Sequence, residues 1–555
     1  MLLKLKNIMN LCTAGWRFPC FIFVLSLLLC AFLSSLNDIP ERDVAGRYAV
    51  MAEAFAAGDW DYAFHPRIPP VMPCCAGVVV WLTGCSGFVA AKTVSVLFFA
   101  ACVFPLYGIF LRTFNENIAR WGCVLLMFSS HLLRIAVSGL RDSSKGLAII
   151  IACYAILCIW QQRTKLAGYS WCIAGAVLLT LTRGDCILYA ALFMGAAFIF
   201  ELYRQRSFFF PWRTILAVVL YLFCLSPQLY YNYRMIGYPV PEVRYGMILN
   251  KFEQWSGFNI FYNHNAIMKL PDAQTKEEAQ KVNSVKELCT AGTVSAVSSN
   301  IFGDSSTVPQ NGYSVTEFID SLFKGFYPYF FLFALPVIVM RIYRRDWKVE
   351  ESILLAVLMG HAFLIVMQIL IFDKSLYVSR RYLIPVAPVA FGWSAIGMLG
   401  LWGWLCSKIP VLEKRAAAPM VFAGCAIALL ADSAGPMIKD YTSCKKNTER
   451  KATIQIAEFI RNDFGGQAER INRELICLAY RSNRRPLILG DLPVVGYCAG
   501  GQNIYREDAD VKSGRIMPDY IVAVYDEKGK PYPGFNLIRR VQINNTRYDV
   551  WKSGR

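Results

Sequence analysis

Long runs of apolar residues recur along most of this 555-residue chain and constrain its fold more than any other feature. A helix needs about 20 apolar residues to cross the hydrocarbon core of a bilayer. Hydrophobic residues make up 56 % of the chain and charged residues only 17 %, whereas soluble proteins carry about 25 %. This composition excludes a cytosolic enzyme, a disordered chain and a disulfide-stabilised scaffold. Eleven segments qualify as predicted membrane spans: about 18–36, 87–111, 119–138, 146–161, 168–182, 186–203, 212–230, 324–340, 352–372, 383–406 and 417–433.

Basic residues predict how these spans are oriented. The net charge is +18, but the Lys and Arg residues fall in short clusters between apolar runs, which argues against a nucleic-acid partner. The N-terminus and the short connections after every second span are basic, as the positive-inside rule expects of cytoplasmic segments. We therefore expect a multi-pass protein of the cell membrane with a retained first span and a cytoplasmic N-terminus. Loops 37–86 and 231–323 and the tail from residue 434 then face outward.

The tail differs in composition from the rest of the chain. Residues 1–433 are predicted to form the membrane domain, and residues 434–555 a small extracytoplasmic, periplasmic α/β domain. Apolar residues at helical spacing predict a helix, and short runs of β-branched and aromatic residues predict strands. The predicted elements are a helix at 453–464, buried strands at 486–491 and 520–525, and a pair of edge strands within 540–551.

Ionisable residues are scarce in the middle of the predicted spans and gather at their outer ends and in the outer loops. A transporter usually keeps polar groups near the midplane of the bilayer, on broken helices. This distribution favours chemistry at the outer membrane–water interface. A transporter or lipid flippase without transferase activity, and a non-catalytic membrane scaffold, are the alternative functions.

The first outer loop begins with an acidic stretch and continues as a predicted interfacial helix. One face of this helix carries the apolar residues Val44, Tyr48, Met51, Ala52 and Phe55, while Arg47 and Glu53 are predicted to face water. The sequence Gly58-Asp59-Trp60 and a proline pair, Pro69-Pro70, follow.

Three further motifs lie on the same predicted side of the membrane: Arg141-Asp142, the stretch Ser226–Gly237, and Arg380–Pro388. In this order the motifs resemble those of the GT-C glycosyltransferases. They are most similar to the branch of protein O-mannosyltransferases and aminoarabinose transferases, which uses polyprenyl-phosphate-linked sugars. The resemblance extends over most of the chain. It implies a polytopic α-helical fold with an extracytoplasmic α/β domain, and inverting transfer of a sugar from polyprenyl phosphate to an acceptor.

Such a transfer needs a carboxylate that removes a proton from the acceptor. Asp43 is the predicted base and Glu41 the alternative; a third interpretation makes Asp43 the N-cap of the interfacial helix. Family members commonly place the acid four residues before the loop tyrosine, whereas Asp43 precedes Tyr48 by five. One residue corresponds to about 100° around an α-helix, so the choice of base is left open.

Asp142 is the third catalytic candidate, and it either orients the acceptor or forms a surface ion pair with Arg141. The phosphate leaving group needs cations and hydrogen-bond donors. Arg234, Arg381, Tyr382 and Arg141 are the predicted substrate-binding residues. Arginines at helix ends also bind lipid headgroups, which is the alternative role of Arg234 and Arg381. The reserve candidates for the phosphate are Arg380, Arg183, Lys145 and Lys92.

The sequence predicts no metal site, because it lacks a clear carboxylate cluster; a divalent metal stays open. The predicted partners are the lipid bilayer, a polyprenyl-phosphate sugar as donor substrate, and a glycan, lipid or protein acceptor. The identities of the sugar and the acceptor stay open. Cysteines outside the predicted spans leave disulfides open as well: Cys289, Cys444, Cys477 and Cys498.

Overall fold

A computed structural model of the chain separates into two compact units, each assembled from distant stretches of sequence. Unit 2 collects the first predicted outer loop and most of the second outer loop and of the tail, while unit 1 holds most of the predicted spans. The predicted boundary at residue 434 stays a prediction. Unit 1 comprises Met1–Leu36, Lys92–Ser226 and Thr307–Ile438, and unit 2 comprises Asn37–Ala91, Pro227–Ser306 and Lys439–Arg555.

The description that follows concerns the residues that the structure describes. Three predicted site residues lie outside them: Arg380, Arg381 and Tyr382. So do the four cysteines considered for disulfides, except for the backbone of Cys444. The described residues are 15–37, 40–41, 43–64, 66, 68–161, 165–205, 211–256, 262–263, 265–266, 330–372, 383–409, 431, 435, 438, 444–464, 487–490, 502–504, 519–524, 535–543 and 546–554.

Among the described residues, six helices are long and apolar enough to cross a membrane. A seventh crossing results if α8 (Glu116–Met127) and α9 (Ser130–Val137), which meet at a bend of 53°, count as one span. The long helical stretches are α2 (Arg17–Ser35), α6 (Gly87–Ala101) followed by α7 (Val103–Thr113), α10 (Asp142–Gln161), α13 (Trp212–Ile236), α18 (Val349–Phe372), and η5 (Ile384–Ala390) followed by α20 (Phe391–Lys408).

Shorter apolar helices fill other predicted spans. The predicted span at 417–433 lies outside the described residues except for residue 431, so the total of eleven stays a prediction. These helices are α11 (Lys165–Thr182), α12 (Ile187–Gln205), and α17 (Leu335–Tyr343) with the preceding turn η4 (Phe330–Ala334). A further short apolar helix, α5 (Val71–Thr83), lies in the predicted outer loop 37–86.

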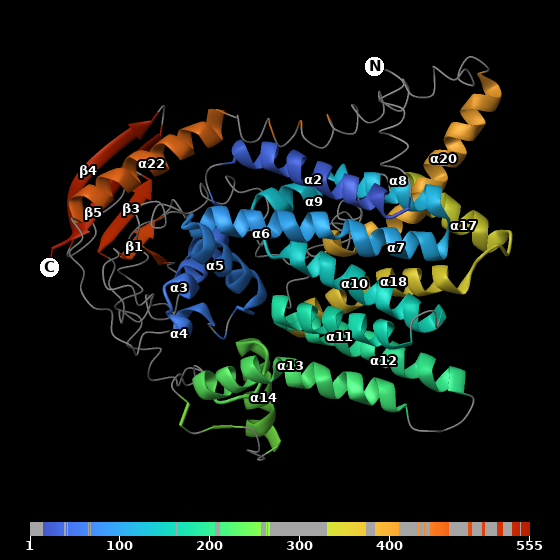
Figure 1. Ribbon diagram of the computed structural model, residues 1–555. Helices are drawn as coiled ribbons and strands as arrows, with labels where there is room; N and C mark the ends of the chain where they lie inside the picture. Colours follow the sequence, from blue (N-terminus) through green and yellow to red (C-terminus); the bar gives the residue numbers. More distant parts are fainter. Residues whose placement is uncertain are drawn as a thin grey trace. The chain divides into compact units, whose positions relative to one another are not determined.

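Helix α10 forms the centre of unit 1, and all its residues from Asp142 to Ile159 are buried except Ile151 and Tyr154, which are partly buried. Helix α11 packs along it, as Figure 1 shows. Gly175 permits this close approach, because a Cβ at that position would lie 2.9 Å from the backbone nitrogen of Ala152. By contrast, α13 exposes large apolar side chains such as Phe223 along its length. Exposed apolar side chains on a span are compatible with lipid, which is as apolar as they are.

In unit 2 the C-terminal strands form a five-stranded mixed sheet with the order β2-β1-β3-β5-β4. Strands β2, β1 and β3 are parallel, and β5 and β4 are antiparallel. Helix α22 (Cys444–Phe464) packs on the sheet through Ile456 and Ile460 (Figure 1). Strands lie at both predicted buried positions, and the predicted pair within 540–551 corresponds to the antiparallel strands β4 and β5. Only β4 lies at an edge of the sheet, because β5 also pairs with β3. The strands are β1 (Leu487–Gly490), β2 (Gln502–Ile504), β3 (Tyr520–Val524), β4 (Phe535–Ile543) and β5 (Thr546–Ser553).

Asp463, near the end of α22, connects this helix to two strands. Its carboxylate accepts hydrogen bonds from the hydroxyl of Tyr520 on β3 (2.7 Å) and the ammonium of Lys552 on β5 (3.0 Å). Partial burial opposes the charged form, but these two donors outweigh it and lower the pKa of Asp463.

Candidate functional site

Asp43 begins a helical segment that contains one turn of π-helix. The segment consists of η1 (Val44–Tyr48), a π-helix, and α3 (Ala49–Ala56). The backbone N–H of Ala49 donates to the carbonyl of Val44, five residues earlier. A π-turn stacks residues five apart as an α-helix stacks residues four apart. The π-turn therefore accommodates the extra residue between Asp43 and Tyr48, and Asp43 lies about one helical turn before Tyr48.

The side chain of Asp43 does not cap this helix, so the N-cap interpretation is wrong. Its carboxylate lies 3.6 Å from the guanidinium of Arg47, and both side chains are about one-third exposed. Glu41 precedes the π-turn, and its backbone carbonyl accepts from Val44 N (2.9 Å) and Ala45 N (2.8 Å). Of the two candidate bases, Asp43 has the spacing to Tyr48 that the family pattern implies.

The interfacial helix is more buried than its pattern predicts. Ala49, Val50 and Ala54 are buried in addition to the predicted apolar face. Glu53 does not simply face water: its carboxylate accepts a hydrogen bond from Gly87 N at 2.9 Å. A Cβ at Gly87 would collide with the carbonyl oxygen of Ala49. Close packing between α3 and the start of α6 thus fixes the helix that carries Asp43.

The stretch Ser226–Gly237 forms the end of α13. Asn232 is fully buried, accepts from Gln228 Nε2 (3.0 Å) and donates to the carbonyl of Val240 (2.6 Å). Gly237 then reverses the chain with a φ of +86°, which glycine adopts without strain. Arg234 lies between them with an exposed side chain. Phosphate binding and headgroup binding by Arg234 both stay predictions.

The two predicted outer loops contact each other within unit 2. The backbone N–H of Val243, at the start of α14 (Val243–Ser256), donates to the carbonyl of Pro66 at 3.0 Å. The rings of Phe64 and Tyr231 lie 5.9 Å apart. The sequence contains no cue for this pairing, because the contacting residues are far apart along the chain.

Asp142 is buried rather than on the surface. It opens α10, is 1 % exposed, and pairs through Oδ1 with Nη1 of Arg183 at 3.2 Å. Arg183 is itself only 6 % exposed. The Asp142 carboxylate is buried, so the prediction that it forms an ion pair with Arg141 at the surface is wrong about the location. Arg183, a reserve candidate, becomes a principal residue of this site.

Lys145 lies one turn after Asp142 and is also 1 % exposed. Its ammonium is 5.2 Å from the centroid of the Tyr189 ring on α12. That ring lies 5.2 Å from the ring of His361 on α18. We call Asp142, Lys145, Arg183, Tyr189 and His361 the Asp142 cluster. Another reserve candidate, Lys92, donates to the carbonyl of Ser34 at 2.7 Å.

Turn η5 completes the surroundings of the Asp142 cluster in unit 1. A Cβ at Gly146, next to Lys145, would lie 3.4 Å from the carbonyl oxygen of Pro385. The cluster thus gathers the starts of α10 and α12, the end of α11, the middle of α18, and η5. Asp43 and Arg234 belong to unit 2. A single cavity lined by all predicted site residues stays a prediction.

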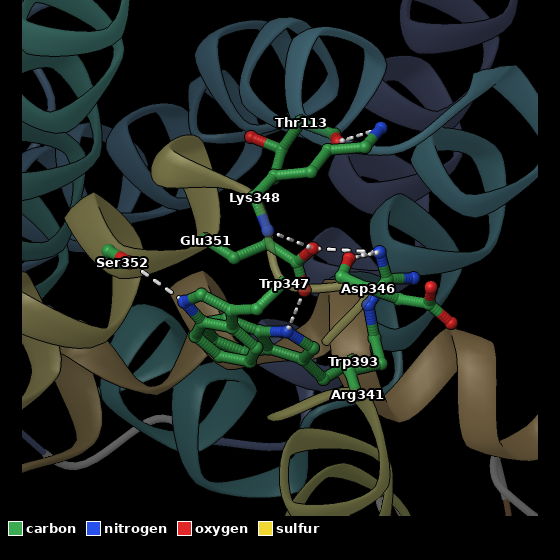
Figure 2. Close-up of polar contacts among 8 residues, drawn as sticks. All are labelled: Thr113, Arg341, Asp346, Trp347, Lys348, Glu351, Ser352 and Trp393. Carbon is green, nitrogen blue, oxygen red and sulfur yellow. Dashed lines mark hydrogen bonds and ion pairs between the residues drawn. The ribbon is translucent and has the colours of Figure 1, made fainter. Parts of the chain in front are cut away.

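Figure 2 shows a second buried cluster, the Glu351 cluster. It lies near the other end of α10, where Gln161 donates to the neighbouring Glu350. Glu351 is fully buried and accepts hydrogen bonds from Arg341 (2.8 Å), Trp393 Nε1 (2.9 Å) and the backbone N–H of Lys348 (3.4 Å). The rings of Trp347 and Trp393 are stacked, with centroids 5.8 Å apart. These contacts join α17, α18 and α20, so the cluster is a structural clamp.

The remaining contacts of the Glu351 cluster satisfy its other polar groups. Lys348 Nζ donates to the carbonyl of Thr113 at the end of α7 (3.3 Å), and Trp347 Nε1 donates to Ser352 Oγ (2.7 Å). Nearby, Gln161 at the end of α10 donates to Glu350 at 3.1 Å. Among the described residues, no group of three or more His, Cys, Asp or Glu side chains is arranged to hold a metal ion.

Comparison with known proteins supports the fold at the level of the whole chain. No protein-family profile matches the chain, and no curated protein matches its sequence. It is similar to the structure of ArnT, an aminoarabinose transferase from Cupriavidus metallidurans, bound to undecaprenyl phosphate. The two are 14 % identical with a TM-score of 0.56, and the match covers 97 % of this chain and 98 % of that chain.

The apo structure of the same ArnT gives 15 % identity and a TM-score of 0.51, covering 96 % and 97 % of the two chains. The oligosaccharyltransferase of Archaeoglobus fulgidus gives 11 % identity and a TM-score of 0.49, covering 91 % and 69 %. The similarity to ArnT shows the GT-C fold. The resemblance inferred from motif order is confirmed at the level of the fold, and the chain is a polytopic membrane protein.

Proposed function

We propose that this protein is an inverting glycosyltransferase that moves a sugar from a polyprenyl-phosphate carrier to an acceptor at the outer face of the cell membrane. The observation that carries this proposal is the fold, shared along nearly the whole chain with an aminoarabinose transferase whose structure contains undecaprenyl phosphate. We also propose the predicted topology, with eleven spans, a cytoplasmic N-terminus and an extracytoplasmic α/β tail domain.

Asp43 is the proposed general base. Its partly exposed carboxylate can reach an acceptor group, and the π-turn gives it the spacing to Tyr48 expected of the family's acid. In a single displacement the acceptor oxygen attacks the anomeric carbon while its proton passes to Asp43. The bond from the anomeric carbon to the phosphate oxygen breaks, and polyprenyl phosphate leaves. Inversion follows because attack and departure occur on opposite sides of that carbon.

The phosphate carries away the electron pair of the broken bond, and cations stabilise the charge that develops on it. Arg234, Arg381, Tyr382 and Arg141 are proposed for this task. Arg234 is exposed at the end of a membrane-length helix, where a lipid phosphate would lie. Asp142 is proposed to act through its ion pair with Arg183, since its carboxylate is buried.

Transfer of radiolabelled sugar from polyprenyl-phosphate donors to membrane fractions tests the proposal. We expect Asp43→Asn to lower the rate about 10²- to 10⁴-fold, the usual contribution of a general base. Glu41→Gln should retain most activity, because Glu41 precedes the π-turn. Asp59→Asn, a neutralised carboxylate in the same loop, is the matched control and should transfer sugar like the wild type.

Full turnover by the double variant Glu41→Gln/Asp43→Asn would overturn the assignment of the base. A wild-type protein that moves lipid across vesicles but transfers no sugar from any polyprenyl-phosphate donor would favour the alternative, a transporter or flippase.

A further inference from the structure

Helix α14 carries an exposed apolar stripe, although it is too short to cross a membrane. Its 14 residues span about 21 Å, whereas a bilayer core is about 30 Å thick. Ile248, Phe252 and Trp255 recur at the i, i+4 and i+7 positions of one helical face, and they are 39 %, 55 % and 83 % exposed. The rings of Phe252 and Trp255 lie 6.1 Å apart. A continuous exposed apolar surface of this kind indicates an interaction site.

A neighbouring face of α14 fixes the direction of this stripe. Tyr245 and Leu249 pack against a buried apolar cluster that contains Tyr238. The buried carboxylate of Glu253 accepts a hydrogen bond from the hydroxyl of Tyr238 at 2.5 Å. These side chains lie about 90° around the helix from the stripe, at 100° per residue. The helix is therefore held along one side, while the stripe stays exposed on another.

The same contacts determine the depth of α14 relative to the membrane. The buried cluster also contains Met235 and Ile236, the last two residues of α13. Helix α13 is long and apolar enough to cross a membrane, and Tyr230 near its end is exposed. Figure 1 shows α14 beside this end of α13. A helix that packs on the last turn of a span lies at the depth where hydrocarbon meets the lipid headgroups.

We propose that Ile248, Phe252 and Trp255 insert into the lipid surface beside the end of α13, with α14 lying in the plane of the interface. Short helices with one apolar face bind at this depth, and tryptophan is enriched there because its ring is apolar and its N–H is polar. The proposed topology makes this surface the outer leaflet. The inference goes beyond the proposed function, since it concerns how the second outer loop is held on the membrane.

Fluorine NMR of the full chain in lipid nanodiscs tests the inference. The chain is labelled with 5-fluorotryptophan, and the resonance that is missing from Trp255→Phe is assigned to Trp255. Trp551, a partly exposed residue on β5 of the tail sheet, is assigned in the same way through Trp551→Phe and is the matched control. Each resonance is recorded with a lipid that carries a spin label near its headgroup, and separately with a water-soluble gadolinium chelate.

We expect the spin-labelled lipid to remove most of the intensity of the Trp255 resonance and little of that of Trp551. The gadolinium chelate should have the opposite preference. Phe252→Ser, which makes an exposed position of the stripe polar, should reduce the effect of the labelled lipid on Trp255 severalfold. An unchanged effect in this variant would contradict insertion of the stripe.

Two further outcomes would overturn the inference. Broadening of Trp255 by the gadolinium chelate alone would place its ring in water. Protection of Trp255 from both reagents would mean that protein covers the stripe, either another segment of the chain or a second copy. A nanodisc presents both leaflets, and no donor or acceptor is added. The result is therefore independent of the proposed topology and of sugar transfer, and the inference and the proposed function can fail separately.

Discussion

Two buried charged clusters of unit 1 lie near opposite ends of α10, and their charges are balanced differently. Asp142 begins the helix and Gln161, beside the Glu351 cluster, ends it. At 1.5 Å per residue these ends are about 28 Å apart, close to the thickness of a bilayer core. Glu351 accepts from Arg341 and Trp393, while among the described residues the ammonium of Lys145 contacts the face of the Tyr189 ring.

The carboxylate of the Glu351 cluster is held by a set of donors, whereas among the described residues no carboxylate lies within ion-pair distance of the Lys145 ammonium. A buried ion pair with satisfied hydrogen bonds loses stability when one partner is removed. A buried cation without a carboxylate partner costs stability in the folded protein. The comparison therefore predicts effects of opposite sign for substitutions in the two clusters.

The largest expected effect on stability is that of Glu351→Ala. It leaves the guanidinium of Arg341 and the indole N–H of Trp393 without their acceptor, and should lower the free energy of unfolding by about 3 kcal/mol. Unfolding by SDS in mixed micelles measures this loss. Glu350→Ala, which removes a half-buried neighbour, is the control and should cost much less. A wild-type unfolding curve for Glu351→Ala would contradict the clamp.

Lys145→Met should act in the opposite direction. Lys145 has no carboxylate partner among the described residues, so replacing its buried ammonium by an apolar side chain of similar length should raise the free energy of unfolding by about 1–2 kcal/mol. The same unfolding assay measures the gain. A loss as large as that of Glu351→Ala would mean that both clusters are structural and would remove the contrast between them.

Trp393→Phe is expected to have the smallest effect of the three. The ring that stacks on Trp347 is kept in part, while the hydrogen bond to Glu351 is lost, at a cost of about 1 kcal/mol. Comparison with Glu351→Ala then shows how much of the clamp depends on Arg341. Equal losses for the two variants would assign the stabilisation mainly to the indole.

The helix of the first outer loop contains a π-turn that its apolar pattern does not predict. Apolar spacing correctly predicts a helix from Val44 onward, because burial of apolar side chains follows the helical period. The pattern assumes an α-helix, so it leaves Asp43 out of phase with Tyr48. The π-turn adds one residue to the helical turn, which apolar spacing does not encode, and α3, which follows it, packs closely against Gly87.

The sequence alone determined the class of this protein, because the length and composition of the apolar runs follow directly from the solvent in which a chain folds. Motif order also indicated the GT-C fold, and the tail strands followed from local patterns. Only the tertiary structure decided that Asp142 is buried against Arg183, that Lys145 faces Tyr189, and that Glu351 clamps its helices. These pairs join residues up to 44 positions apart, and spacing along a chain carries no information about which helix ends meet in a packed bundle.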